Sequence, residues 1–173
     1  MGAAIWVGIL QVQILNQNGT CDGNATVPGH WMPPPVDHLK LNCDAAVLQN
    51  GNQVGVGVVC RDYRGSLVGA MGEILLYRLQ PRAAELMAIL KGLEWCNGQG
   101  WRGLIIETDC LEAVQLVNGT DECLADEGLL VDRIRFLMGS MGIQGIHFVP
   151  RVVNGAAHVV AGFVARDNGD IVS

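Results

Sequence analysis

The chain has 173 residues, of which 50% are hydrophobic and 16% are charged, and its formal net charge is −6 at pH 7. This length suits one well-buried domain with an extension, and the composition is that of a globular chain and excludes a disordered one. The acidic balance also argues against a strongly cationic protein that coats nucleic acid, although an acidic body can carry a small electropositive groove.

Six cysteines are scattered along the chain without the CxxC or Cys/His spacing of a zinc site. Several fall inside apolar periodic segments, as buried free thiols of a reducing compartment do. The apolar stretch of residues 3–15 has no basic start and no small-residue cleavage site, and no segment reaches the length of a membrane span. We therefore expect an intracellular protein, nuclear or cytoplasmic, that is not secreted and has no membrane partner.

Residues 1–36 are predicted to form an irregular N-terminal extension. Residues 17–30 are rich in Asn, Gly and Thr, and residues 31–35 (WMPPP) form a stiff proline-rich linker that cannot join the interior of a sheet. We expect the folded domain over residues 37–168 and a short C-terminal tail over residues 169–173.

The first periodic segment, residues 38–47, alternates apolar and polar side chains, which predicts a β-strand with Asp44 on its polar face. Asn-Gly at residues 50–51 predicts a tight turn, and the valines that alternate with glycines over residues 54–60 predict a second strand. After another turn, residues 67–77 predict a third strand. The three strands are expected to pair as an antiparallel meander.

After the third strand, apolar side chains recur with the spacing of helices, and short apolar strands separate these helices. Proline suits the first turn of a helix, and Asn-Gly suits its end. The remaining predicted elements are a helix from Pro81 to Asn97-Gly98, a strand over residues 103–109, helices over about 110–117 and 126–138, a strand over 143–149, and a helix capped by Asn154.

This order of elements predicts an α/β fold. Right-handed crossovers place the later strands parallel to the first, so five strands form a mixed sheet in the spatial order 3-2-1-4-5 with helices on both faces. The connections on either side of the first strand run in opposite senses, and ligands bind in the crevice that opens there. Asp44 and Asp109 are expected to face this crevice.

Three carboxylates are predicted to meet there: Asp44, Glu85 from the first turns of the long helix, and Asp109 at the end of the fourth strand. Clustered carboxylates raise one another's pKa values unless cations lie among them. Hard oxygen ligands of this kind suit Mg²⁺ or Mn²⁺, and two such ions would hold and polarise a phosphodiester.

Each of these residues also has a purely structural interpretation. Asp44 fits a solvated strand face, and Glu85 fits the favourable dipole near a helix N-terminus. Asp109 fits a helix capping box with Glu112. Glu107 is a weaker candidate, expected on the sheet face with Asp109 or solvated nearby. These alternatives stay open at this point.

Five short motifs, in this order, resemble the type 1 ribonuclease H domain, and most closely its plant branch related to the reverse transcriptases of non-LTR retroelements. The resemblance spans roughly residues 36–166. The motifs are Leu41-Asn42-Cys43-Asp44-Ala45-Ala46, residues 55–62 (GVGVVCRD), Arg82-Ala83-Ala84-Glu85-Leu86, Glu107-Thr108-Asp109-Cys110 and Asn154-Gly155-Ala156-Ala157-His158.

Members of that family hydrolyse the RNA strand of RNA–DNA hybrids with two Mg²⁺ ions held by an Asp, Glu, Asp, Asp set. The resemblance implies that Asp44 bridges both ions and that Glu85 and Asp109 each ligate one. The fourth acidic position is His158 here, and imidazole is a poorer partner for Mg²⁺ and a tolerable one for Mn²⁺. His158 is expected as a ligand or proton shuttle, or alternatively as a helix-surface residue without a metal.

The resemblance also implies an RNA–DNA hybrid as partner. We further expect a monomeric protein and no small-molecule organic cofactor. Arg61, Arg82 and Arg151 are candidate contacts to phosphates, although each arginine alone also fits a solvated surface. Small residues around Asn50 are expected to let the duplex approach.

The function expected from the resemblance is metal-dependent endonucleolytic cleavage of RNA in a hybrid, leaving 5′-phosphate and 3′-hydroxyl ends. The first alternative is a catalytically weakened module that binds nucleic acid, because His158 replaces an acidic ligand. A phosphotransfer enzyme of the haloacid dehalogenase type is a second alternative, but it needs an aspartate two residues after Asp44, where this chain has Ala46.

Overall fold

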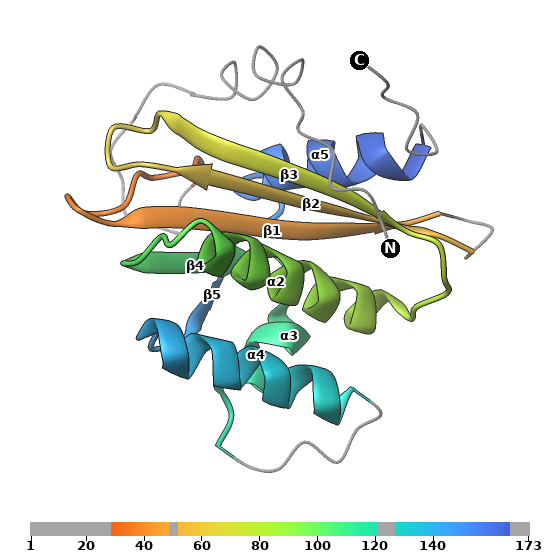
Figure 1. The fold of residues 1–173 in the computed structure, drawn as a ribbon. Coiled ribbons are helices and arrows are strands. Elements are labelled where there is room, and N and C mark those ends of the chain that lie inside the picture. Colours follow the sequence, from red (N-terminus) through yellow and green to blue (C-terminus); the bar gives the residue numbers. More distant parts are fainter. Residues whose placement is uncertain (1–28, 49–51, 121–126, 167–173) are drawn as a thin grey trace.

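A computed structural model describes residues 29–48, 52–120 and 127–166 of the protein (Figure 1). Its helices and strands follow the predicted order. The elements are β1 Leu39–Val47, β2 Val54–Arg61, β3 Leu67–Leu75, α2 Pro81–Gly98, β4 Leu104–Thr108, α3 Leu111–Asn118, α4 Gly128–Met141, β5 Ile146–Phe148 and α5 Gly155–Arg166.

The strands form one five-stranded sheet in the order β3-β2-β1-β4-β5, which confirms the predicted topology. β1 pairs antiparallel with β2 and parallel with β4, and β4 pairs parallel with β5. The register places Cys43 of β1 opposite Thr108 of β4. The next residue of each strand, Asp44 and Asp109, therefore lies at the same level of the sheet.

Helices α2 and α5 cover opposite faces of the sheet, and α4 lies outside α2 (Figure 1). Leu41 and Cys43 of β1 pack in the larger core with Leu86 and Leu93 of α2. The alternate residues of β1, which include Asp44, point to the α5 face, where a smaller core holds Val59 and Val160. The period of two in β1 thus divides an apolar face from a polar one.

Two glycines let α5 lie directly against β2. A Cβ atom at Gly57 would lie 2.3 Å from the carbonyl oxygen of Ala157, and one at Gly55 would lie 2.2 Å from that of Ala161. Both neighbours are backbone atoms, so no side-chain rotation can make room. Gly57 is also the β2 residue opposite Asp44, so this close approach sets the distance between α5 and the polar face of β1.

We expect Gly57→Ala to lower the free energy of unfolding by about 1–3 kcal/mol, because the added methyl group must push α5 away from β2. Urea denaturation measures the change. The matched control is Gly139→Ala in α4, where a Cβ atom would meet nothing within 4 Å and alanine favours the helix. Equal stability of Gly57→Ala and the unmodified protein would contradict the close packing of α5.

Helix α4 ends later in the sequence than predicted. The sequence predicted that Gly139 ends this helix, but the helix continues to Met141, whose side chain is 7% exposed. Gly142, with a φ of 72°, ends the helix in the left-handed region, where glycine is favoured. Burial of Met141 thus outweighs the low helix propensity of Gly139.

Strand β5 has three residues, whereas residues 143–149 were predicted to be extended. The side chain of Asn118, at the end of α3, fixes the start of this strand. It donates a hydrogen bond to the Ile146 carbonyl oxygen at 2.8 Å and accepts one from the Ile146 amide at 2.9 Å. These bonds satisfy both backbone groups of Ile146 that a neighbouring strand would otherwise pair.

The last residues of the predicted extension contact the sheet. The Trp31 indole N–H donates a hydrogen bond of 2.9 Å to Asn42 Oδ1, and Lys40 Nζ donates one of 2.7 Å to the Met32 carbonyl oxygen. The Arg61 guanidinium lies 3.8 Å from the centre of the Trp31 ring. Residues 31–32 therefore cover the α5 face of the sheet at the start of β1.

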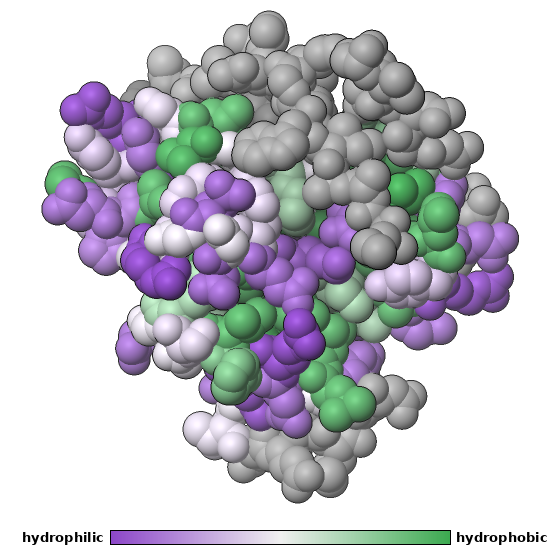
Figure 2. All heavy atoms as spheres, in the orientation of Figure 1, coloured by the Kyte–Doolittle hydropathy of each residue, from purple (hydrophilic) through white to green (hydrophobic). Residues whose placement is uncertain are grey.

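The prediction of free thiols is confirmed for the cysteines that the structure describes. Cys43, Cys60 and Cys96 are buried, Cys110 is partly exposed, and Cys21 and Cys123 lie outside the described residues. No helix in the described ranges is long and apolar enough to cross a membrane. On the face shown in Figure 2, hydrophilic and hydrophobic side chains are intermixed.

Candidate active site

Three carboxylates converge between β1 and β4. Asp44 projects from β1, Glu85 from the second turn of α2, and Asp109 from the residue that follows β4. One oxygen of each lies within 4.8 Å of those of the other two. The predicted convergence is confirmed, and Asp44 is fully buried rather than solvated.

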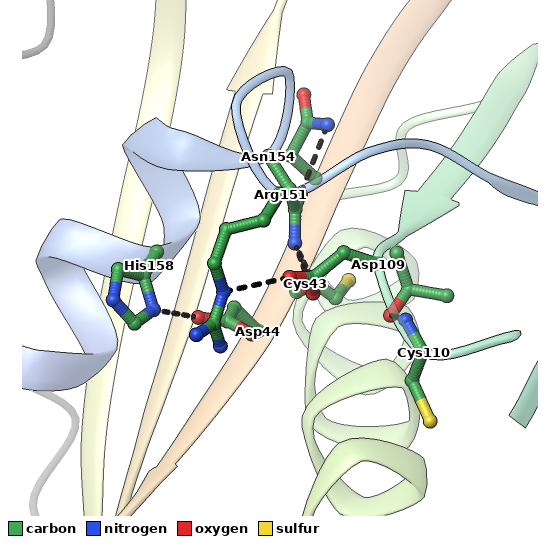
Figure 3. A network of polar contacts seen from close by, with 9 residues as sticks. Cys43, Asp44, Asp109, Cys110, Arg151, Asn154 and His158 are labelled. Carbon is green, nitrogen blue, oxygen red and sulfur yellow. Dashed lines mark hydrogen bonds and ion pairs between the residues drawn. The ribbon is translucent and has the colours of Figure 1, made fainter.

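The capping-box alternative for Asp109 is wrong. The N-cap residue of α3 is Cys110, and it makes no side-chain cap bond. The Asp109 carboxylate instead accepts hydrogen bonds from Arg151 Nε at 3.1 Å and from Asn154 Nδ2 at 3.2 Å (Figure 3). Asp109 therefore faces the crevice and not the helix that follows it.

Two buried carboxylate oxygens of the cluster, Asp44 Oδ1 and Glu85 Oε2, have no hydrogen-bond partner among the described residues. Burial and then the neighbouring Asp109 raise the pKa of Asp44 to about 6, against the opposing effect of His158. Burial, followed by the charges of Asp44 and Asp109, raises the pKa of Glu85 to about 9. A divalent cation would supply the positive charge that this cluster lacks, and the unpartnered carboxylate oxygens would coordinate it.

His158 lies in the first turn of α5, at the edge of the carboxylate cluster (Figure 3). Its Nδ1 is 2.7 Å from Asp44 Oδ2, and its side chain is 43% exposed. Among the described residues, the potential ligand atoms that lie within 4.8 Å of one another belong to the three carboxylates, and no nitrogen of His158 is among them. His158 thus contacts the site through Asp44, and it is not an isolated residue of the helix surface.

Asn154 is the site residue that sequence reasoning assigned only to helix capping. Its side chain is fully buried, donates to the Cys43 carbonyl oxygen at 2.9 Å and to Asp109 at 3.2 Å, and accepts from Asn42 at 3.2 Å. It therefore ties the start of α5 to β1 and to Asp109. The one sequence signal for this role is its place as the first residue of the motif that ends in His158.

The predicted nucleic-acid contacts fall in different places. Arg151 is 64% exposed and reaches the site through its ion pair with Asp109. Arg82 forms ion pairs with Glu127 at 3.0 Å and Glu112 at 3.5 Å on the α3–α4 side of the molecule. Asn50 lies outside the described residues.

Arg61 does not lie on an open surface, contrary to its predicted role as a phosphate contact of a bound duplex. It is 5% exposed, beneath the Trp31 ring. Glu107, the weaker carboxylate candidate, is 6% exposed and forms an ion pair of 2.8 Å with Lys40. Its carboxylate also accepts a bond of 3.0 Å from Asn42, so Glu107 belongs to a structural network beside the site.

We expect Mg²⁺ or Mn²⁺ binding at pH 7 to release about one proton per protein, because Glu85, with a pKa of about 9, is protonated in the metal-free site and a cation replaces its proton. Titration calorimetry in two buffers of different ionisation enthalpy measures the release. Glu85→Gln should bind the metal more weakly and release no proton at this step.

The same pKa shift makes the metal-free protein sensitive to pH. Since the folded pKa of Glu85 lies above its ordinary value of 4.5, the free energy of unfolding falls as pH rises from 4.5 to about 9. Thermal unfolding in EDTA should therefore occur at a lower temperature at pH 8 than at pH 5.5. The difference between these two temperatures should be smaller in Glu85→Gln. Absence of both the proton release and this dependence would contradict the buried position of Glu85.

Comparison with known proteins supports these observations. A family model described as reverse transcriptase-like matches residues 42–164. No match was found among curated proteins. Ribonuclease H1 of the halophilic archaeon Halobacterium salinarum NRC-1 has a similar structure, with a TM-score of 0.67 at 24% identity over 76% of this chain and 98% of that chain.

Two further structures share the fold. LC11-RNase H1, isolated from compost, gives a TM-score of 0.68 at 16% identity, covering 77% of this chain and 99% of that chain. The same relative in complex with an RNA/DNA hybrid gives 0.65 at 17% identity, covering 75% and 98%. Sheet order, helix placement and these likenesses define a ribonuclease H-like fold. The family match extends over most of that domain, and the chain belongs to the reverse transcriptase-like family.

Proposed function

We propose that this protein is a metal-dependent endoribonuclease that hydrolyses the RNA strand of RNA–DNA hybrids. The observation that carries the proposal is the meeting of Asp44, Glu85 and Asp109 between β1 and β4 of a ribonuclease H-like sheet. Two buried oxygens of this cluster have no partner among the described residues. The relative bound to an RNA/DNA hybrid supports the substrate class. We further propose that the protein acts as a monomer without an organic cofactor.

The three carboxylates would hold the divalent cations, for which we propose two Mg²⁺, with Mn²⁺ as an alternative. Their donor atoms are all oxygens, which these ions prefer. When bound, such cations polarise a phosphodiester and favour attack by water. Asp44 would hold a cation through Oδ1, which is buried without a hydrogen-bond partner among the described residues, while its Oδ2 contacts His158.

His158 would orient the Asp44 carboxylate and hold a proton beside it. Its Nδ1 lies within hydrogen-bond distance of Asp44 Oδ2. The ring is also 43% exposed, so it can exchange its proton with solvent. Arg151, exposed at the mouth of the site, offers a positive charge to the phosphates of the bound strand and neutralises Asp109 when no cation is bound.

A second candidate function is a binding module without turnover. The observation that favours it is the contact of His158 with Asp44, because the imidazole occupies a carboxylate oxygen that a metal ion would otherwise use. In this case the protein binds a hybrid through the same face and releases it intact.

Incubation with an end-labelled RNA–DNA hybrid in Mg²⁺, Mn²⁺ or EDTA tests the two candidates. The nuclease is expected to shorten the RNA strand only with a divalent cation, to leave 5′-phosphate and 3′-hydroxyl ends, and to spare duplex DNA of the same sequence. Hybrid binding without cleavage in both metals would support the binding module. Neither binding nor cleavage would overturn both proposals.

A further inference from the structure

A pocket with a mostly apolar lining lies on the α5 face of the sheet, and none of the three carboxylates lines it. Its volume is about 380 Å³, and its lining includes His30, Trp31, Arg61, Val152, Gly155 and Ala156. A volume of this size falls in the range of pockets that hold small organic ligands, about 300–1,000 Å³.

Arg61 gives this pocket its charge. Its guanidinium donates one long bond, from Nη2 to Asn42 Oδ1 at 3.3 Å, and Nε has no partner among the residues that the structure describes. The side chain is 5% exposed, and the Trp31 ring covers it at 3.8 Å. A guanidinium carries five N–H donors, so most of the Arg61 donors have no partner among the described residues although the side chain is buried.

No carboxylate in the described ranges forms an ion pair with Arg61. Glu107, which interacts with it electrostatically, is already bonded to Lys40 at 2.8 Å and to Asn42 at 3.0 Å. Two buried cations thus share one carboxylate, and one positive charge is left over. A buried charge is costly without a counter-ion, and burial lowers the pKa of Arg61 to about 10.

The start of α5 adds donors to the same pocket. Gly155 and Ala156 are the first two residues of this 12-residue helix, and both line the pocket with Arg61. The first N–H groups of an α-helix have no partner within the helix, and the helix dipole makes this end favourable for an anion. A guanidinium beside a helix N-terminus is the donor combination that binds phosphate groups.

We propose that this pocket binds a phosphate group, from inorganic phosphate or from a nucleotide, between the Arg61 guanidinium and the N–H groups of Gly155 and Ala156. Trp31 and Val152 form its apolar wall and leave room for the rest of a nucleotide. The pocket shares none of the three carboxylates, so the proposal does not depend on nuclease activity.

Titration of the ¹⁵N-labelled full chain with inorganic phosphate, in EDTA and at constant ionic strength, tests the proposal by NMR. We expect saturable shifts of the Gly155 and Ala156 amides and of the Trp31 indole N–H. Arg61→Gln should weaken the apparent affinity about tenfold or more, because a charged donor is lost. The control Arg133→Gln removes an exposed arginine of α4, 65% accessible, and should change nothing.

Gly155→Pro keeps the test valid if Arg61→Gln fails to fold. Proline suits the first residue of a helix and removes one amide donor, so it should weaken phosphate binding while α5 remains formed. The proposal would be overturned by shifts that rise linearly without saturation or by equal shifts from chloride. It would also be overturned if Arg61→Gln and Gly155→Pro both bound phosphate as tightly as the unmodified protein does. A parallel titration with 5′-AMP separates the sources: tighter binding than phosphate identifies a nucleotide site, and equal binding identifies a site for the free anion.

Discussion

Asp44→Asn should reduce the rate of hybrid cleavage in Mg²⁺ about 10³-fold or more. Asp44 is the fully buried member of the cluster, and its raised pKa reflects its burial and the neighbouring Asp109. An amide cannot supply the negative charge that holds a divalent cation, and a loss of about 4 kcal/mol of electrostatic stabilisation corresponds to this factor. Single-turnover cleavage of a labelled hybrid measures the rate, and calorimetry measures the accompanying loss of metal affinity.

The metal-free fold should survive this substitution. Asparagine is nearly isosteric with aspartate and removes a charge from a buried site, so the melting temperature in EDTA should be equal or higher. Asp132→Asn is the matched control, because Asp132 is 64% exposed on α4 and its contact with Arg135, at 3.9 Å, is weak. If Asp44→Asn cleaved at the original rate, Asp44 would have no part in catalysis.

His158→Asp should increase Mg²⁺ affinity about tenfold and raise the cleavage rate in Mg²⁺ relative to Mn²⁺. The substitution places a fourth carboxylate next to Asp44, where imidazole nitrogen now lies at 2.7 Å, and anionic oxygen suits Mg²⁺ better than nitrogen does. Metal titrations of binding and of cleavage, with both ions, measure the effect.

The same variant should be less stable without metal, because two carboxylates would then meet where His158 and Asp44 form a hydrogen bond. His158→Asn serves as the control that removes the imidazole without adding a charge. Cleavage rates below that of the unmodified protein in both His158→Asp and His158→Asn, with both metals, would show that the imidazole itself is required and that this position is not a weakened ligand site.

The position of the carboxylate cluster could be predicted from the sequence because it depends on a few strong rules. The strand period put Asp44 on one face of β1, and the right-handed crossover put β4 beside it. Once the two strands are parallel neighbours, the residues that follow Cys43 and Thr108 meet at one level. Prediction of the carboxylate cluster thus requires the order and direction of the strands but little knowledge of side-chain packing.

The environment of Arg61 could not be predicted in the same way. The strand period identifies its face but not what covers that face. A tryptophan before a run of prolines carries no local sign that it folds back onto the sheet, so residues 31–32 were assigned to a linker. The multiple bonds of Asn154 depend on a similar long-range contact, 111 residues along the chain from Cys43.

Helix α5 follows every strand of the sheet in the sequence and contributes His158, with Asn154 directly before it. During synthesis, β1, α2 and β4 therefore emerge from the ribosome before the residues that orient Asp44 and Asp109. Since a domain generally folds as a unit, we expect the three acidic groups to come together only after the segment with Asn154 and His158 has also emerged. The carboxylate cluster thus gains its polar partners, His158 and Asn154, only when α5 docks on the sheet.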